Sequence, residues 1–229
     1  MGYSLVIAEK PSVAQAYAKV LGCNDRKDGY IVGNGYIVSW CIGHLVEMCM
    51  PDEYCKEWEG NWKVSNLPMI PEEWKHKVSK NTSKQYRILK SLMDRDDVTE
   101  VIEACDAGRE GELISRLVYY QARCNKPLKR LWISSMEDSA IRDGFNNLKE
   151  ATEYEALYQS ALCRSKADWL IGMNGTRLFS CKYGKKLNVG RVVSPTLAMI
   201  VDREYHIEHF VKKPFYRVHL DLNGINAVS

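Results

Sequence analysis

Short strand-like runs alternate with helix-like segments through the N-terminal two thirds of this chain, and this alternation limits the fold more than any other feature. Residues 4–8 form a continuous apolar run and residues 98–104 a second strand-like run; helical patterns follow over residues 11–21 and 109–122. A continuous apolar run is typical of a strand buried on both faces of a parallel sheet. Residues 1–150 are therefore predicted to form an α/β domain with a mostly parallel, Rossmann-like sheet.

The segments between these runs have their own patterns. The turn sequence Gly33-Asn34-Gly35 separates two strand-like runs, which predicts a β-hairpin, and Ser135 is placed to cap the N-terminus of a helix. The hairpin is predicted over residues 29–47, and an ordered but irregular segment follows over residues 50–75. Further along the chain, helices are predicted over residues 84–93 and 135–148 and a strand over residues 128–133.

The character of the sequence changes after about residue 152. Residues 153–180 and 192–209 are predicted to be long helices, and residues 215–222 alternate like a strand that has no partner in view before residue 229. Residues 151–229 are therefore predicted to be part of a separate helical domain, together with the first strand of the domain after it.

Basic residues gather in this second part, although the net charge of the whole chain is only +3. A local positive field favours a polyanionic partner, and a solvated basic surface is the alternative that charge alone leaves open. The stretch has one acid, Asp168, and seven basic residues, namely Arg164, Lys166, Arg177, Lys182, Lys185, Lys186 and Arg191.

The cysteines and the hydropathy exclude several classes of protein. None of the eight cysteines forms a C-x-x-C pair, which weighs against a structural zinc site. Several lie in apolar runs, and buried reduced thiols are typical of a cytoplasmic protein. No apolar run approaches the 18 residues that a membrane-spanning helix needs, and no signal peptide is evident. We therefore expect a soluble cytoplasmic protein.

Acidic residues follow the two main strand-like runs. Glu9 follows the first run, Asp106 follows the second, and Glu110 lies in the next helical turn. The carboxyl ends of parallel strands meet at one edge of a sheet, so these side chains are predicted to converge if the two strands are neighbours. Three close carboxylates repel one another unless a cation neutralises them, and Mg²⁺ suits such oxygen ligands. Lys10 and Arg109 lie beside the acids and are placed to contact a phosphate.

A plainer interpretation of the same acids stays open. A glutamate after a strand is most often only a loop residue, and Glu110 and Glu112 lie in a first helical turn, where acids favour the helix dipole.

Two motifs resemble the Toprim domain that topoisomerases, primases and some nucleases share. The first is Ala8-Glu9-Lys10-Pro11-Ser12, and the second runs from Asp106 through Gly108 to Glu112. Further motifs make the chain similar to type IA DNA topoisomerases of the topoisomerase III branch over nearly its whole length. These motifs are Gly43–Leu45, Leu131–Ser135, Arg164–Arg177, Leu187–Leu197 and Arg203-Glu204.

The resemblance implies roles for particular residues. Glu9, Asp106 and Glu110 are implied as ligands of Mg²⁺, Glu9 takes part in acid–base chemistry, and Lys10 stabilises the transition state at the scissile phosphate. The second part of the chain becomes a partial DNA-binding domain. The residues expected to contact single-stranded DNA are Arg109, Arg164, Arg177 and Arg191. For Arg164 the alternative is an ion pair with Asp168 one helical turn later.

The chain departs from the family pattern at two points. Gly108 stands where the family has a second aspartate, which puts binding of two ions in doubt, and Glu112 points away from Glu110 on the helix. The nucleophilic tyrosine of the family lies in a Tyr-x-Arg-Thr-like motif, which these residues lack. Tyr205 does not match that motif and is expected to pack along its helix.

The implied activity belongs to the complete enzyme. It relaxes or decatenates DNA without ATP through transient single-strand cleavage and a 5′-phosphotyrosyl link, and some relatives work with a helicase. This chain is expected to supply the Mg²⁺ site and part of the DNA groove, and to be inactive in cleavage by itself. One alternative is a stand-alone Toprim nuclease or primase, which residues 164–204 weigh against. Another is a natural, non-catalytic truncation that only binds DNA. The unpartnered final strand favours an artificial cut over such a natural truncation.

Overall fold

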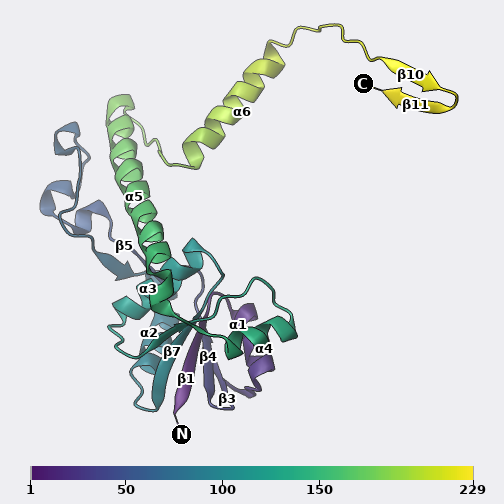
Figure 1. Cartoon of the computed structure of the whole chain (residues 1–229). Helices are drawn as coiled ribbons and strands as arrows, with labels where there is room; N and C mark the ends of the chain where they lie inside the picture. The colour runs from purple at the N-terminus through teal and green to yellow at the C-terminus, as the bar shows by residue number, and fades with distance from the viewer. Residues whose placement is uncertain (1, 229) are drawn as a thin grey trace.

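A seven-stranded sheet organises the first part of the computed structural model, which describes residues 2–228 (Figure 1). The four inner strands β4, β1, β7 and β8 run parallel, and the outer strands pair antiparallel, so the predicted mostly parallel sheet is confirmed. In spatial order the strands are β2 (Asp25–Lys27), β3 (Tyr30–Gly33), β4 (Tyr36–Trp40), β1 (Tyr3–Ala8), β7 (Val98–Ala104), β8 (Leu128–Arg130) and β9 (Lys149–Glu150).

Helices cover both faces of the sheet, and the alternation of side chains along β1 shows why. Leu5 and Ile7 point into one core with α2 (Ser83–Met93) and α3 (Arg109–Gln121), whereas Val6 and Ala8 point into a second core. The second core is closed by α1 (Pro11–Leu21) and α4 (Asp138–Asn146). Because β1 is buried on both faces, an apolar residue is required at every one of these positions.

Two boundaries near the end of this sheet differ from the predictions. β8 stops at Arg130, opposite Glu103 of β7, and so is shorter than the predicted strand over residues 128–133. The next helix begins at Asp138, with Glu137 in the N-cap position. Ser135 is not the cap: its hydroxyl accepts the backbone N–H of Glu137 at 3.3 Å, ahead of the helix.

The irregular segment predicted over residues 50–75 is an excursion between two short strands. β5 (Val46–Met48) pairs antiparallel with β6 (His76–Val78), and the chain between them forms the 3₁₀ turns η1 (Pro51–Glu53), η2 (Lys56–Trp58) and η3 (Val64–Asn66). A fourth turn, η4 (Lys80–Thr82), leads into α2. The excursion lies beside the long helix α5 (Figure 1).

The second part of the chain is mainly helical. η5 (Ala151–Tyr154) leads into α5 (Glu155–Tyr183), which spans 29 residues, and α6 (Val193–Glu208) follows and extends away from the sheet (Figure 1). Both long helices match their predicted ranges closely. Tyr205 stacks on His209 with ring centroids 4.1 Å apart, in agreement with the expectation that it packs along its helix.

The predicted final strand has a partner after all. β10 (His219–Leu222) begins later than expected and pairs antiparallel with β11 (Ile225–Val228) around Asn223-Gly224, both at positive φ. The expectation of a strand without a partner was therefore wrong, because the short run of residues 225–228 was not recognised as a strand. No helix among residues 2–228 is long and apolar enough to cross a membrane.

Candidate functional site

Two acidic residues, Glu9 and Asp106, lie in contact at the edge of the sheet where the parallel strands end, through the main chain of Asp106. Glu9 directly follows β1, and Asp106 is the second residue after the adjacent β7. Oε2 of Glu9 accepts the backbone N–H of Asp106 at 3.4 Å. Nζ of Lys10 lies 3.6 Å from Oε1 of Glu9, and the Lys10 side chain is 57% exposed. The structure thus brings three of the predicted site residues together and leaves one cation facing solvent.

Glu110 lies in the first turn of α3 and is held by cationic and neutral partners of its own. Its carboxylate forms an ion pair with Arg164 of α5, and Nε2 of His44 lies 3.6 Å from Oε2 of Glu110. Burial lowers the pKa of His44; the nearby charge of Arg164 also lowers it, while Glu9 opposes both effects. His44 is therefore expected to be neutral at pH 7, which leaves Arg164 as the charge that balances Glu110.

The three predicted ligands do not form one preformed cage. Among residues 2–228, no three His, Cys, Asp or Glu side chains are grouped closely enough to hold a metal ion. Glu9 and Asp106 are together, whereas Glu110 is turned toward Arg164 because an opposite charge attracts it and the other carboxylates repel it. The donor set still fits Mg²⁺, which is commonly bound by one or two carboxylates together with water and substrate phosphates.

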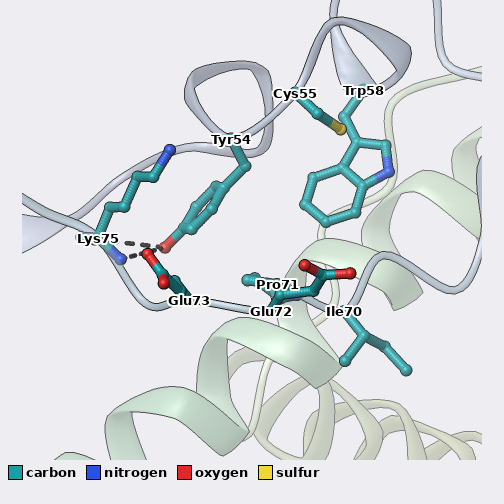
Figure 2. A pocket seen from close by; sticks show the side chains of 8 residues that line it. All are labelled: Tyr54, Cys55, Trp58, Ile70, Pro71, Glu72, Glu73 and Lys75. Atoms are coloured by element: carbon teal, nitrogen blue, oxygen red, sulfur yellow. Dashed lines mark hydrogen bonds between the residues drawn. The ribbon is translucent and has the colours of Figure 1, made fainter.

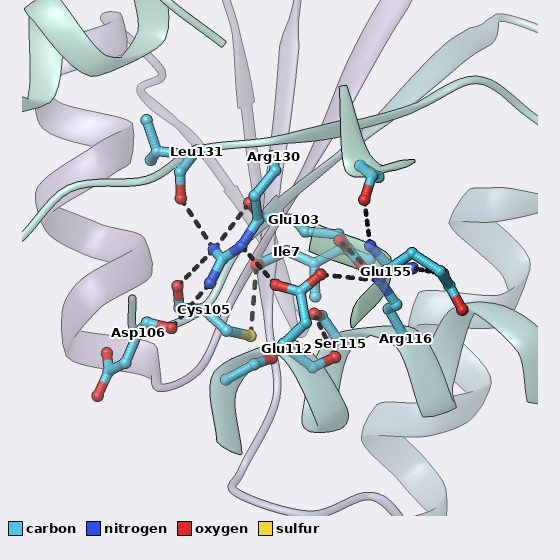
Figure 3. A network of polar contacts seen from close by, with 12 residues as sticks. Ile7, Glu103, Cys105, Asp106, Glu112, Ser115, Arg116, Arg130, Leu131 and Glu155 are labelled. Atoms are coloured by element: carbon cyan, nitrogen blue, oxygen red, sulfur yellow. Dashed lines mark hydrogen bonds and ion pairs between the residues drawn. The ribbon is translucent and has the colours of Figure 1, made fainter. Parts of the chain in front are cut away.

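A buried guanidinium lies beside the main chain of Asp106 (Figure 3). Arg130, the last residue of β8, is fully buried and donates from Nη1 to the carbonyl oxygens of Cys105 at 2.7 Å and Leu131 at 2.8 Å. Its Nη2 donates to the carbonyl oxygen of Asp106 at 2.8 Å, and its Nε donates to Glu112 at 2.9 Å. The carboxylate of Asp106 points away from this network (Figure 3). Arg130 therefore binds the main chain of the loop that carries Asp106.

Glu112 is the centre of this network and is not available to a metal. One of its oxygens accepts from Arg130 and the other accepts from Nε of Arg116 at 2.8 Å, and all three side chains are at most 2% exposed. Arg116 also donates to Glu155 at 2.5 Å and to the carbonyl oxygen of Ala151, and so connects α3 to the start of α5. Glu112 therefore does not take the place of the metal-binding aspartate that the family has at the position of Gly108.

A second buried carboxyl group, Glu103, has no hydrogen-bond partner for either oxygen within residues 2–228. Arg116 Nε lies 3.7 Å from it but donates to Glu112 instead. Burial, with the nearby charge of Glu112, raises the pKa of Glu103 to about 8. A neutral Glu103 also balances the network, because the two arginines are then matched by Glu112 and Glu155.

The sequence alone did not predict this network of buried charges. Glu112 and Arg116 are spaced one helical turn apart, which is a signal, but the same spacing is common on exposed helix surfaces. Arg130 is the last residue of the short strand Leu128–Arg130 and is followed by Leu131. Only the sheet order shows that this strand lies beside β7.

The four predicted DNA-binding arginines have different surroundings. Arg109 is exposed at the N-terminus of α3. Arg191 pairs with Asp168 through two contacts, at 2.8 and 3.2 Å, so the alternative pair between Arg164 and Asp168 is wrong. Arg177 is buried, donates to the carbonyl oxygen of Trp58 and lies over the Trp62 ring. It packs the excursion onto α5, and its contact with DNA stays a prediction.

Two of the hollows at or near the excursion differ in their lining. One, of about 340 Å³, is lined by aromatic and acidic side chains that include Tyr54, Trp58, Glu72 and Glu73 (Figure 2). Its carboxylates make it unsuited to a phosphate. The other, of about 320 Å³, extends from His44 along α5 to Asp168 and Trp169, and so borders the carboxylate edge. The second hollow lies nearer the predicted chemistry.

Comparison with known families identifies relatives of this chain. A family model described as Toprim domain matches residues 4–136, and a model described as DNA topoisomerase matches residues 152–228. The chain is 49% identical over 216 residues to DNA topoisomerase 3 of Shouchella clausii (strain KSM-K16), which covers 94% of this chain and 30% of the relative. It is 46% identical over 225 residues to DNA topoisomerase 3 of Bacillus subtilis (strain 168), covering 98% and 31%. The chain thus spans about a third of the length of these relatives.

A solved structure has the same fold. Full-length topoisomerase I from Thermotoga maritima superposes with a TM-score of 0.65 at 23% identity, over 98% of this chain and 34% of that one. At this identity the likeness concerns the fold alone.

Proposed function

Because this chain belongs to the Toprim domain family, in its type IA, topoisomerase III-like branch, we propose that it binds Mg²⁺ and single-stranded DNA for strand cleavage and rejoining. Residues 1–150 are the Toprim domain in this proposal, and residues 151–229 are part of the DNA-binding helical domain. Glu9 and Asp106 are the first two ligands of the ion. Glu110 joins them by turning from Arg164, which then becomes free to bind a phosphate.

The observation that carries the proposal is the contact between Glu9 and Asp106 at the ends of adjacent parallel strands. A divalent ion bound there supplies positive charge against the charge that develops on a reacting phosphodiester. Lys10, beside Glu9 and largely exposed, is placed to bind a non-bridging phosphate oxygen. Glu9 is placed to accept or return a proton, since it is the least exposed carboxylate at this edge.

The arginines supply the DNA contacts in this proposal. Arg164 and Arg191 are each paired with an acid on a partly exposed surface, and such pairs contribute only about 0–1 kcal/mol. A phosphate can therefore compete for either guanidinium at little cost. Contacts of this kind give binding that depends on salt and hardly on base sequence.

The whole protein's activity extends beyond these residues. We propose that it changes DNA topology without ATP through a 5′-phosphotyrosyl intermediate, with single-stranded DNA as substrate and a helicase as a candidate partner. We also propose that it acts in the cytoplasm, because its proposed substrate is DNA. Residues 1–229 hold no tyrosine in a Tyr-x-Arg-Thr-like motif, so they are expected to bind but not to cleave. Robust plasmid relaxation by this chain alone would contradict that expectation.

The metal assignment is tested by binding of a fluorescent oligothymidylate with and without Mg²⁺. Mg²⁺ is expected to tighten binding several-fold in the wild type, and Asp106→Asn is expected to remove this effect because it loses one ionised ligand. Asp143→Asn, a change in an exposed α4 residue, is the control and should respond to Mg²⁺ as the wild type does. Equal responses of Asp106→Asn and wild type would refute the assignment. Mg²⁺-dependent nicking of the oligonucleotide would instead favour a stand-alone Toprim nuclease.

A further inference from the structure

The loop that carries Asp106 is held from two sides. On one side, Arg130 binds three carbonyl oxygens of the main chain, those of Glu103 at 3.3 Å, Cys105 at 2.7 Å and Asp106 at 2.8 Å (Figure 3). On the other side, α3 approaches so closely that a Cβ on Gly111 would lie 2.1 Å from the carbonyl oxygen of Asp106. The main chain at Asp106 therefore has little freedom to shift.

The orientation of Arg130 is itself determined by Glu112. The Nε of Arg130 donates to Oε2 of Glu112, and the remaining donors of its planar fork then point at the end of β7. Glu112 is oriented in turn by Arg116 on its other oxygen. A buried ion pair is no more stabilising than an apolar pair of similar volume, so stability alone does not explain an arginine at this position. What the guanidinium adds is directional hydrogen bonding.

We propose that Arg130 is a positioning residue that holds Asp106 in place to bind the divalent cation, with Glu112 orienting Arg130. The inference rests on the proposed function, because it takes Asp106 as a ligand. Groups that hold ligands in place typically change metal affinity about 10–100-fold when they are altered. Arg130 itself touches neither ion nor DNA in this proposal.

The chain offers a matched control for the test. Arg116 belongs to the same buried network and shares Glu112 with Arg130, but its other contacts are Glu155 and the carbonyl oxygen of Ala151. Arg130→Lys and Arg116→Lys therefore disturb the same network, and only the first removes the fork that binds the Asp106 loop. Asp106→Asn is the reference for direct loss of a ligand.

The affinity for Mn²⁺, an ion with similar oxygen ligands, is measured for each folded variant by electron paramagnetic resonance. Arg130→Lys is expected to raise the Kd for Mn²⁺ about 10–100-fold, while Arg116→Lys changes it less than threefold. Thermal unfolding without metal is measured in parallel. Equal rises in Kd for the two lysine variants would overturn the proposal, because they would show a general loss of packing.

Amide hydrogen exchange without metal separates this inference from the proposed function. Arg130→Lys is expected to speed exchange in a peptide that covers residues 103–111, and Arg116→Lys is not. If the wild type binds no Mn²⁺, or if Asp106→Asn binds it as tightly as the wild type, the metal assignment fails and the inference with it, whatever exchange shows. Faster exchange in Arg130→Lys with an unchanged Kd would overturn the inference while the metal assignment stands.

A second variant serves if Arg130→Lys does not fold. Gly111→Ala leaves all the buried charges in place and pushes the carbonyl oxygen of Asp106 away from the helix. It is expected to weaken Mn²⁺ binding by at least tenfold and to speed exchange at residues 106–108. Wild-type affinity in this variant, with the loop displaced, would contradict the inference.

Discussion

Glu103 and Glu112 are neighbouring buried carboxyl groups that differ in their hydrogen bonds. Glu112 accepts from two arginines, whereas Glu103 has a partner for neither oxygen within residues 2–228. Ionising a buried carboxyl group without donors is costly, so burial and the charge of Glu112 raise the pKa of Glu103 to about 8. Two glutamates on adjacent elements of one core thus have unlike chemistry.

The raised pKa predicts how stability changes with pH. The folded state binds the Glu103 proton more tightly than the unfolded state does. The stabilisation of the folded state by this proton is therefore complete below about pH 4.5 and is lost as pH rises through about 8. Glu103→Gln keeps the shape and stays neutral. We expect it to raise the free energy of unfolding at pH 9 by roughly 2 kcal/mol or more and to change it little at pH 4.

Urea unfolding at the two pH values measures this effect. Glu59→Gln, at an exposed position in the excursion, is the control and should leave the pH dependence unchanged. A Glu103→Gln variant that parallels the wild type from pH 4 to pH 9 would show that Glu103 is ionised throughout.

At the scale of elements, α5 is the support for the irregular excursion. Three of its side chains bind carbonyl oxygens there: Trp169 donates to Cys49, Asn174 to Met69 and Arg177 to Trp58. Tyr54, Trp58 and Trp74 also pack around the Trp169 ring. A segment without a regular hydrogen-bond ladder needs such side-chain partners to be ordered.

Asn174 provides a test of this support. Its amide donates to the carbonyl oxygen of Met69 at 2.9 Å and accepts the N–H of the same residue at 2.6 Å, and Met69 is fully buried. Asn174→Ala is expected to cost about 1–3 kcal/mol of unfolding free energy and to speed amide exchange within residues 50–75. Asn61→Ala, at an exposed site in the excursion, should do neither. Unchanged exchange in Asn174→Ala would show that other contacts hold the excursion.

At the scale of the whole molecule, cations and acids meet where α5 packs against α3. The ion pair of Glu110 with Arg164 joins the proposed metal edge to the basic part of the chain, and Arg116 makes a second connection through Glu155. DNA bound along α5 would therefore lie beside the carboxylates. If the proposed function is correct, binding of metal and binding of DNA are expected to be coupled, since each competes for one partner of the same ion pair.

The electrostatic part of DNA binding is tested with Arg191. Arg191→Ala is expected to weaken oligothymidylate binding several-fold and to reduce the slope of log K against log salt by about 0.7, the value for one lost phosphate contact on a single strand. Arg142→Ala, at an exposed position on α4, has the same change of charge away from α5 and should leave the slope unchanged. Fluorescence anisotropy at four salt concentrations measures both, and equal slopes for all three proteins would count against Arg191.

Local patterns were sufficient for much of this structure. The apolar run of β1, Pro11 at the start of α1 and Gly22 at its end, and the turn around Asn34 are short-range signals that the structure confirms. The boundaries at Ser135 and at residues 131–133 were wrong, because pairing with a neighbouring strand decides where β8 stops. The hairpin partner β11 was missed because four residues carry little periodic signal.

The sequence by itself determined that the chain alternates strands and helices, and that Glu9 and Asp106 follow two of those strands. The tertiary structure decided that β1 and β7 are neighbours, so that the Glu9 carboxylate accepts the backbone N–H of Asp106, and that Glu110 turns to Arg164 instead of joining them. It also decided that Glu112, two residues after Glu110, is buried between two arginines. Local propensity depends on nearby residues, whereas the charge and contacts of a side chain depend on groups that only folding brings close.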